Sequence, residues 1–164
     1  MTQLEEAPRL QGFPAVIDKN TTTLILGSFP GEASLQEQQY YAHPRNQFWR
    51  LLSAVLNVDL VVLPYPQRLA GIKAHGIGLW DIFDSCLRQG SLDSAIRQQQ
   101  INDFSALQQQ YPKLHKLCFN GKTAGKVQGH FDKAGYQTLV LPSSSPANAQ
   151  MSFEQKLLLW QAIL

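Results

Sequence analysis

Four short apolar runs, with other patterns between them, constrain the fold of this chain more than any other feature. They lie at residues 23–26, 78–82, 116–119 and 137–141 and have the length of β-strands. Between them, as in the stretch that begins at Phe48, apolar residues recur at helical spacing. Strands that alternate with helices predict a parallel sheet covered on both faces. We expect an α/β fold in a single domain over residues 1–164, since this length and 44% hydrophobic residues suffice for a core.

Three of the expected helices carry positional signals. Pro44 fits the first turn of the helix that contains Phe48. Asn102 is the expected N-cap of a helix over residues 104–111. The pattern Ser152-x-x-Gln155 is typical of a capping box at the start of the last helix.

Composition excludes several classes of protein. No apolar run is long enough to span a bilayer, and residues 1–14 lack the apolar core of a secretory signal. Cys86 and Cys118 form neither a zinc nor an iron–sulfur pattern, and the four histidines show no metal spacing. We therefore expect a cytoplasmic protein in a reducing compartment, with no metal, iron–sulfur cluster or membrane partner. The net charge of +2 combines an acidic segment over residues 1–39 with a basic remainder, which is compatible with a phosphate-bearing partner but common in ordinary domains.

The first candidate site lies at the end of the first strand. Gly27-Ser28-Phe29-Pro30-Gly31 could bring the backbone close to a ligand, or could be only a tight connection to a helix. Loops at the carboxyl ends of strands are where open α/β sheets bind ligands. Further along, Tyr41 precedes a helix, where its ring could stack on a nucleobase. Asn46 could serve either a local capping role or a functional one.

Asn120 ends the third strand and carries the most specific chemistry. The following Gly121-Lys122-Thr123 suggests a phosphate loop, but Lys116 stands where such a loop needs its first glycine, which argues against a Walker-type NTPase. The Asn120 amide can accept from an N–H and donate to a C=O at once. Uracil and hypoxanthine present that pair of groups, whereas cytosine and adenine present the reverse. If the strand order reverses between the first and third strands, the Gly27 loop and Asn120 face each other.

Two further segments are open to more than one interpretation. The serines and prolines of residues 141–149 could hold DNA phosphates or form a solvated loop. Asp81 and Arg88 follow the second strand, and an ion pair or a surface role is the default for both, with a pocket role open. The chain contains no Gly-x-Ser-x-Gly elbow of a serine hydrolase.

Taken together, these motifs resemble the uracil-DNA glycosylase superfamily. Gly27-Ser28-Phe29-Pro30-Gly31 looks like its first motif, and Leu141-Pro142-Ser143-Ser144-Ser145-Pro146 looks like its second. Tyr41-Ala42-His43-Pro44-x-Asn46-x-Phe48-Trp49 is similar to a segment of the mismatch-specific branch. The hypoxanthine-DNA glycosylase (DNA-deoxyinosine glycosylase) branch is the most similar, because its hallmarks recur in order from about Leu24 to Trp160.

The resemblance implies a three-layer α/β/α sandwich around a four-stranded parallel sheet in the order 2-1-3-4. It implies monofunctional hydrolysis of the N-glycosidic bond of deaminated bases in DNA, by base flipping, without metal or cofactor. It further implies that the base is contacted by Phe29, Tyr41, Asn120 and Ser143, and that the DNA backbone is held by Lys122, Ser144 and Ser145. We expect a monomer that associates with the nucleoid when it binds DNA.

Two positions depart from the superfamily pattern. Many members carry Asn or Asp where this chain has Phe29, and a phenyl ring cannot orient water. Asn46 is therefore the expected water-positioning residue, and the Glu32 carboxylate is the alternative. Ala147 is too small to fill the vacated stack, so Asn148, Gln150 or Met151 would have to do so.

Deoxyinosine is the first expected substrate and deoxyuridine the second. Two other classes stay open: a non-catalytic module that binds damaged bases, and a small nucleotide-binding α/β protein unrelated to DNA. The residues alone do not decide between hypoxanthine, uracil and xanthine, because pocket volume depends on the backbone.

Overall fold

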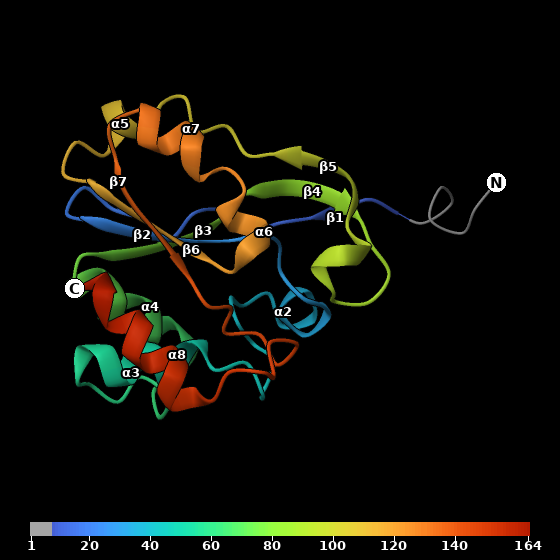
Figure 1. Ribbon diagram of the computed structural model, residues 1–164, viewed down its shortest axis with the longest axis horizontal. Helices are drawn as coiled ribbons and strands as arrows, with labels where there is room; N and C mark the ends of the chain where they lie inside the picture. The colour runs from blue at the N-terminus through green and yellow to red at the C-terminus, as the bar shows by residue number, and fades with distance from the viewer. Residues whose placement is uncertain (1–7) are drawn as a thin grey trace.

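A four-stranded parallel sheet forms the centre of the computed structural model, which describes residues 8–164 (Figure 1). Its order is β3-β2-β6-β7, which is 2-1-3-4 when the four strands are numbered along the chain, as expected. The strands are β2 (Thr23–Gly27), β3 (Ile77–Asp81), β6 (Lys116–Asn120) and β7 (Gln137–Leu141). Each lies within one residue of a predicted apolar run.

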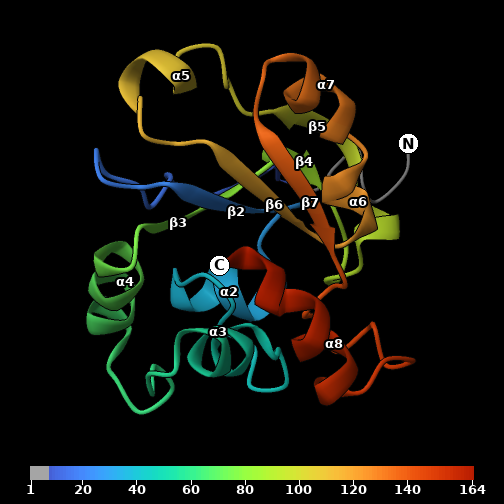
Figure 2. The same cartoon turned by 60° about the vertical axis from the view of Figure 1, so that its left-hand side comes forward.

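Helices cover both faces of this sheet, as the two views show (Figures 1 and 2). One face carries α3 (Phe48–Leu56), α4 (Tyr65–Ala74) and α8 (Phe153–Trp160), followed by the short turn η2 (Gln161–Ile163). The other carries α5 (Leu107–Gln110) and α7 (Gln128–Lys133). Strand β2 contributes to both cores, since Ile25 packs with the α3 side while Leu24 and Leu26 pack with the α7 side.

A second, antiparallel sheet was not predicted. It has the order β1-β4-β5, from β1 (Leu10–Gln11), β4 (Phe83–Leu87) and β5 (Arg97–Ile101). Every residue of β5 is exposed, so this edge strand has no apolar alternation that a sequence pattern could reveal. Between β4 and β5 lies the short turn η1 (Asp93–Ala95).

Two helix starts differ from the prediction and one agrees. Asn102 is not an N-cap, because its amide donates to the Asp81 carbonyl oxygen at 2.8 Å and the helix that follows is only α5. The helix α3 begins at Phe48, so Pro44 lies in the preceding turn and not in its first turn. The capping box of Ser152 and Gln155 is present at the start of α8.

The topology places side by side two strand ends that carry predicted site residues. Strands β2 and β6 are neighbours, and the chain continues from β2 into α2 (Glu32–Glu37) and from β6 into α6 (Lys122–Gly125). The Gly27 loop and Asn120 therefore meet at the carboxyl edge of the sheet, as expected for a reversal of strand order. Among residues 8–164, no helix is long and apolar enough to cross a membrane.

Candidate base-binding pocket

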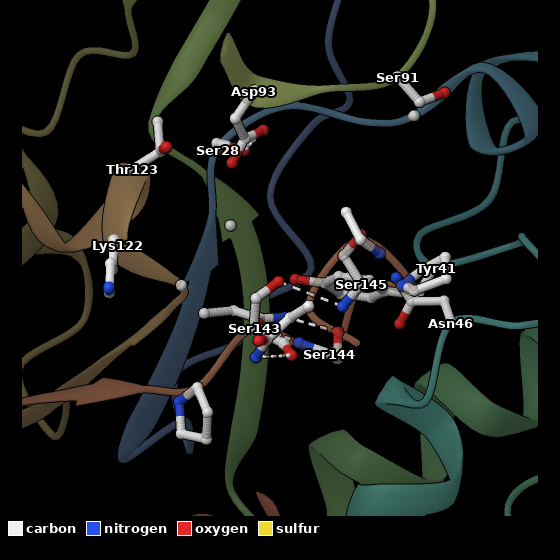
Figure 3. A pocket seen from close by; sticks show the side chains of 18 of the residues that line it. Ser28, Tyr41, Asn46, Ser91, Asp93, Lys122, Thr123, Ser143, Ser144 and Ser145 are labelled. Carbon is white, nitrogen blue, oxygen red and sulfur yellow. Dashed lines mark hydrogen bonds between the residues drawn. The ribbon is translucent and has the colours of Figure 1, made fainter. Parts of the chain in front are cut away.

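A pocket of about 830 Å³ opens at the carboxyl edge of the parallel sheet. The ends of β2, β3, β6 and β7 supply its floor, and the loops that follow α2, β4 and β7 supply its walls. In the view of Figure 3, Tyr41 and Asn46 lie at one side and Lys122 at the other, with Ser143, Ser144 and Ser145 between them. The predicted site residues are thus brought to one cavity, with the exception of Glu32.

Tyr41 has the geometry of a stacking platform. Its ring lies parallel to that of Phe48, with centroids 3.8 Å apart and planes 14° apart. It also lines the pocket, and its backbone adopts a left-handed conformation with φ of 57°. Its hydroxyl is buried without a hydrogen-bond partner, and burial raises the pKa of Tyr41 with a further contribution from the Asp81 charge, although the Asn120 amide opposes the shift.

Gly27 allows this side of the pocket to close. A Cβ atom at this position would lie 2.6 Å from Asp81 Oδ1 and 3.0 Å from the Tyr41 hydroxyl oxygen. The first distance is shorter than real contacts allow, so only glycine fits the observed positions of Asp81 and Tyr41. The requirement for glycine here comes from close approach and not from its φ angle.

Asn120 is held in place by the loop that follows β7. Its Nδ2 donates to Ser144 Oγ at 2.9 Å, and its Oδ1 accepts from the Ser144 backbone N–H at 3.0 Å. The Ser144 carbonyl oxygen in turn accepts from the Gln47 N–H at 3.0 Å. Ser144 leaves one N–H and one lone pair of the Asn120 amide unused, and Asn120 lines the pocket.

The structure gives Ser144 a different task from the predicted contact with the DNA backbone. Its side chain is 1% exposed, and its hydroxyl, N–H and carbonyl groups are all used inside the protein. A phosphate cannot reach a side chain buried in this way, so Ser144 orients Asn120 instead. Ser143 and Ser145 are half-buried and line the pocket, and Lys122 is exposed at its rim.

Asn46 combines a capping role with a place in the pocket wall. Its Oδ1 accepts from the Phe48 N–H at 3.0 Å, which satisfies a free donor at the start of α3. Its backbone N–H donates to the His43 carbonyl oxygen at 2.9 Å. The Nδ2 group and one Oδ1 lone pair are left for a ligand or a water molecule. The two interpretations of Asn46 are therefore compatible.

Glu32 lies elsewhere. It is the first residue of α2, its side chain is exposed, and it is not among the residues that line the pocket. Its backbone N–H donates to Ser91 Oγ at 2.9 Å. The carboxylate predicted as the alternative water-positioning group is thus outside the cavity.

Phe29 and Arg88 form a buried pair behind the Gly27 loop. Phe29 is 7% exposed, and the Arg88 guanidinium carbon lies 5.4 Å from the centre of its ring. Arg88 donates to the carbonyl oxygens of Pro30 and Gly90, both at 2.7 Å. Burial lowers the pKa of Arg88. The surface or ion-pair role expected for Arg88 is therefore wrong: it ties the first motif to the segment after β4.

Asp81 is the functional candidate that the sequence interpretation underestimated. It ends β3, its side chain is 4% exposed, and it lines the pocket. Its Oδ2 is buried without a hydrogen-bond partner among the described residues. Burial and the charge of Asp93 raise the pKa of Asp81 to about 7, although Arg88 opposes the shift. Its place at a strand end beside Gly27 was the only signal in the sequence.

No metal centre accompanies these groups in the part of the chain described, where no cluster of three His, Cys, Asp or Glu side chains could hold an ion. The residues that line the pocket offer amides, hydroxyls, several aromatic rings, the Lys122 ammonium group and two carboxyl groups, of which that of Asp81 is buried and that of Asp93 is exposed. Such a set suits recognition of a flat heterocycle with polar edges.

Comparison with known proteins points to one family. The model of the uracil DNA glycosylase superfamily matches residues 14–164. A hypoxanthine DNA glycosylase of Methanosarcina acetivorans is 48% identical over 87% of this chain and 90% of its own length. A protein of the same description from Methanosarcina barkeri is 47% identical over 84% of this chain and 87% of its own. The solution NMR structure of a Methanosarcina acetivorans protein described as a uracil DNA glycosylase has a TM-score of 0.85 and 43% identity, and it covers 95% of this chain and 99% of that one.

Proposed function

The chain belongs to the uracil DNA glycosylase superfamily, and from that premise we propose that it removes hypoxanthine from DNA by hydrolysing the N-glycosidic bond of deoxyinosine. Two relatives with 48% and 47% identity over most of the chain are hypoxanthine DNA glycosylases, which favours this base over uracil. Uracil is the second substrate. The partner is DNA that contains a deaminated base. The protein acts on it as a monomer in the cytoplasm.

The observation that carries the proposal is the fixed amide of Asn120. Ser144 holds it from two sides, so that one N–H and one lone pair of the amide face the pocket. These groups match the O6 and N1–H edge of hypoxanthine. Adenine offers an amino group and an unprotonated ring nitrogen at the same places. The amide N–H would then face another donor, and the amide lone pair would face another acceptor. A mismatch of this sort leaves buried polar groups unpaired, which costs about 1–3 kcal/mol for each group.

The target base must leave the duplex to reach this amide, because Asn120 lies at the floor of the pocket. Tyr41 supports the flipped base by stacking, with Phe48 behind it as a second layer. A stacked aromatic ring contributes about 1–3 kcal/mol to base binding. The exposed Lys122 and the half-buried Ser145 lie at the rim, where they meet the DNA backbone. Phe29 and Ser143 complete the wall.

Asn46 positions the attacking water. It lines the same pocket as Tyr41 and keeps a donor and an acceptor after it has capped α3. An amide has no useful basicity near pH 7, so Asn46 orients the water and does not deprotonate it. Orientation suffices when the departing base leaves an oxocarbenium-like sugar that captures water readily.

The test uses oligonucleotides that carry a single deoxyinosine, deoxyuridine, deoxyxanthosine or deoxyadenosine at one position. We expect an abasic site, seen as an alkali-labile break, with deoxyinosine first and none with deoxyadenosine. No break with any deaminated base, opposite any partner base, would contradict the proposal. Lesion binding without turnover would identify a non-catalytic module of the same fold.

A further inference from the structure

Asp81 is a buried acid that lines the pocket, and the hydrolysis proposed above gives it no role. Of residues 8–164, it alone combines a carboxyl group with burial. A buried carboxyl oxygen without a partner is costly unless the group is protonated or meets a ligand. Asp81 Oδ2 is such an atom, and it belongs to a residue that lines the cavity.

The sheet register places Asp81 and Asn120 on opposite sides of Gly27. Asp81 pairs with Gly27 at the end of β3, and Asn120 follows Phe119, the partner of Leu26, at the end of β6. Neighbouring strands lie about 4.8 Å apart, so the two residues stand roughly 10 Å apart across β2. Asp81 Oδ1 and the Tyr41 hydroxyl oxygen occupy the space directly over Gly27, so a flat base would lie beside them, with Asn120 on one side and Asp81 on the other. The Asp81 carboxyl lies against Gly27, which has no Cβ to shield it.

The charged and titratable groups that face Asp81 come from every element around it. Asp93 of η1 favours the protonated form of Asp81, and Arg88 of the segment after β4 favours the ionised form. Tyrosine hydroxyls face it from the segment after α2 and from the start of α4, namely Tyr40, Tyr41 and Tyr65. Neither the tyrosines nor Asp93 can neutralise an ionised Asp81, so burial decides and the protonated form prevails up to about pH 7.

We infer that Asp81 is the general acid that protonates N7 of the departing hypoxanthine. The inference rests on the proposed function, because it needs a purine in the pocket. With Asn120 on the O6 and N1–H edge, the inference requires the N7 atom, which is adjacent to O6 on the purine, to face the β3 side. N7 accepts a hydrogen bond, and a carboxyl group donates one only when it is protonated.

The step balances without an added reagent. The proton of Asp81 passes to N7 while the bond between C1′ and N9 breaks and its electron pair stays on the base, so hypoxanthine leaves as a neutral molecule. Water held by Asn46 forms the new bond to C1′ and releases one proton. That proton restores the Asp81 carboxyl group. Uracil has no N7, so the same acid cannot assist its departure.

The test compares single-turnover excision by the wild-type protein, Asp81→Asn and the matched control Asp84→Asn. Asp84 is an exposed carboxylate on the neighbouring strand β4 and lies outside the pocket. General acids contribute about 100- to 10,000-fold, so Asp81→Asn is expected to slow deoxyinosine excision at least 100-fold. Deoxyuridine excision should fall by only a few-fold, and Asp84→Asn should match the wild type on both. Above about pH 7 the wild-type rate with deoxyinosine should fall as the pH rises, while that of Asp81→Asn stays flat.

A substrate analogue tests the same step by a change in the base, with the wild-type protein and Asp81→Asn compared on it. An oligonucleotide with 7-deaza-deoxyinosine keeps the edge read by Asn120 but has no N7 atom. The wild-type protein should remove this base as slowly as Asp81→Asn removes hypoxanthine, and Asp81→Asn should lose nothing more on it. Wild-type rates for Asp81→Asn with deoxyinosine, or equal losses with deoxyinosine and deoxyuridine, would overturn the inference and leave the proposed function intact. Absence of all excision by the wild-type protein would overturn both.

Discussion

Asn120 and Ser144 exchange two hydrogen bonds, one through each end of the asparagine amide. This arrangement fixes which way the amide faces. A free amide can flip and present either its oxygen or its nitrogen to a base. Because the Ser144 N–H can only donate, it holds the Asn120 oxygen on its own side. The residue that we propose reads the base is thus oriented by Ser144, whose side chain is buried.

Replacement of Ser144 by Ala removes one of these two bonds. We expect deoxyinosine excision to fall about 10-fold and the free energy of unfolding to fall by about 1 kcal/mol. The Ser144 backbone N–H is kept, so the Asn120 amide is held by one bond instead of two and less firmly. A purely structural loss would leave base selectivity alone, so the informative measurement is excision of deoxyadenosine, which we expect to be absent in the wild type and detectable at a low level in Ser144→Ala. Ser105→Ala, at an exposed position, is the matched control. No excision of deoxyadenosine by Ser144→Ala would contradict the orienting role.

Replacement of Gly27 by Ala tests the close approach at the pocket floor. The new methyl group would lie 2.6 Å from Asp81 Oδ1, and overpacking of this kind costs about 1–3 kcal/mol. We expect a loss of activity of more than about 100-fold, since Asp81 and Tyr41 must both move. Gly129→Ala in α7 is the control, because a Cβ there meets nothing within 4 Å. That variant should gain about 0.5–1 kcal/mol and keep full activity, and a similar gain in Gly27→Ala would refute the packing argument.

The stability of the protein should depend on the ionisation of Asp81. Its pKa is raised from 3.8 to about 7, so between these values the folded state binds more protons than the unfolded state. The stabilisation is therefore full below about pH 4 and is lost as the pH rises through 7. It amounts to at most about 4 kcal/mol, at 1.36 kcal/mol for each pKa unit. Urea unfolding of Asp81→Asn should show higher stability than the wild type at pH 8 and a smaller difference at pH 5, and equal curves at both values would contradict this.

Asn46→Ala should lose both functions of the residue. We expect deoxyinosine excision to fall at least about 100-fold, because the water is no longer oriented. The lost bond to the Phe48 N–H should also cost about 0.5–2 kcal/mol of stability, measured by urea unfolding. Asn46→Asp keeps an oxygen for that bond, so it should keep the stability whatever its activity. Wild-type rates in Asn46→Ala would move the water-positioning role to another residue that lines the pocket.

The parallel sheet was predictable because its strands are buried. Strand β2 has both faces covered and therefore reads as an unbroken apolar run. The antiparallel sheet was not predictable, because β5 is exposed throughout and is defined only by its pairing with β4. Pairing between distant segments leaves no local pattern.

The candidate site, like the fold, could be predicted from the sequence only in part. Tyr41, Asn46 and Asn120 could be placed together from strand order, since all three follow or face strand ends. The tasks of Ser144 and Arg88 depend on which atoms their side chains reach, which motifs do not encode. Arg88 was expected in an ion pair or at the surface, because arginine is rarely buried without a partner. Here carbonyl oxygens and an aromatic ring take the place of an acidic partner.

The pairing of Phe29 with Arg88 limits which side chains the Phe29 position can accept. The resemblance places Asn or Asp in many relatives where this chain has Phe29. A substitution of Phe29 by Asn would leave a cavity behind the loop and would remove the ring that covers a buried cation. A polar group therefore cannot be installed at this position by one substitution without a loss of packing. Arg88 and its contacts with carbonyl oxygens would have to change together with Phe29.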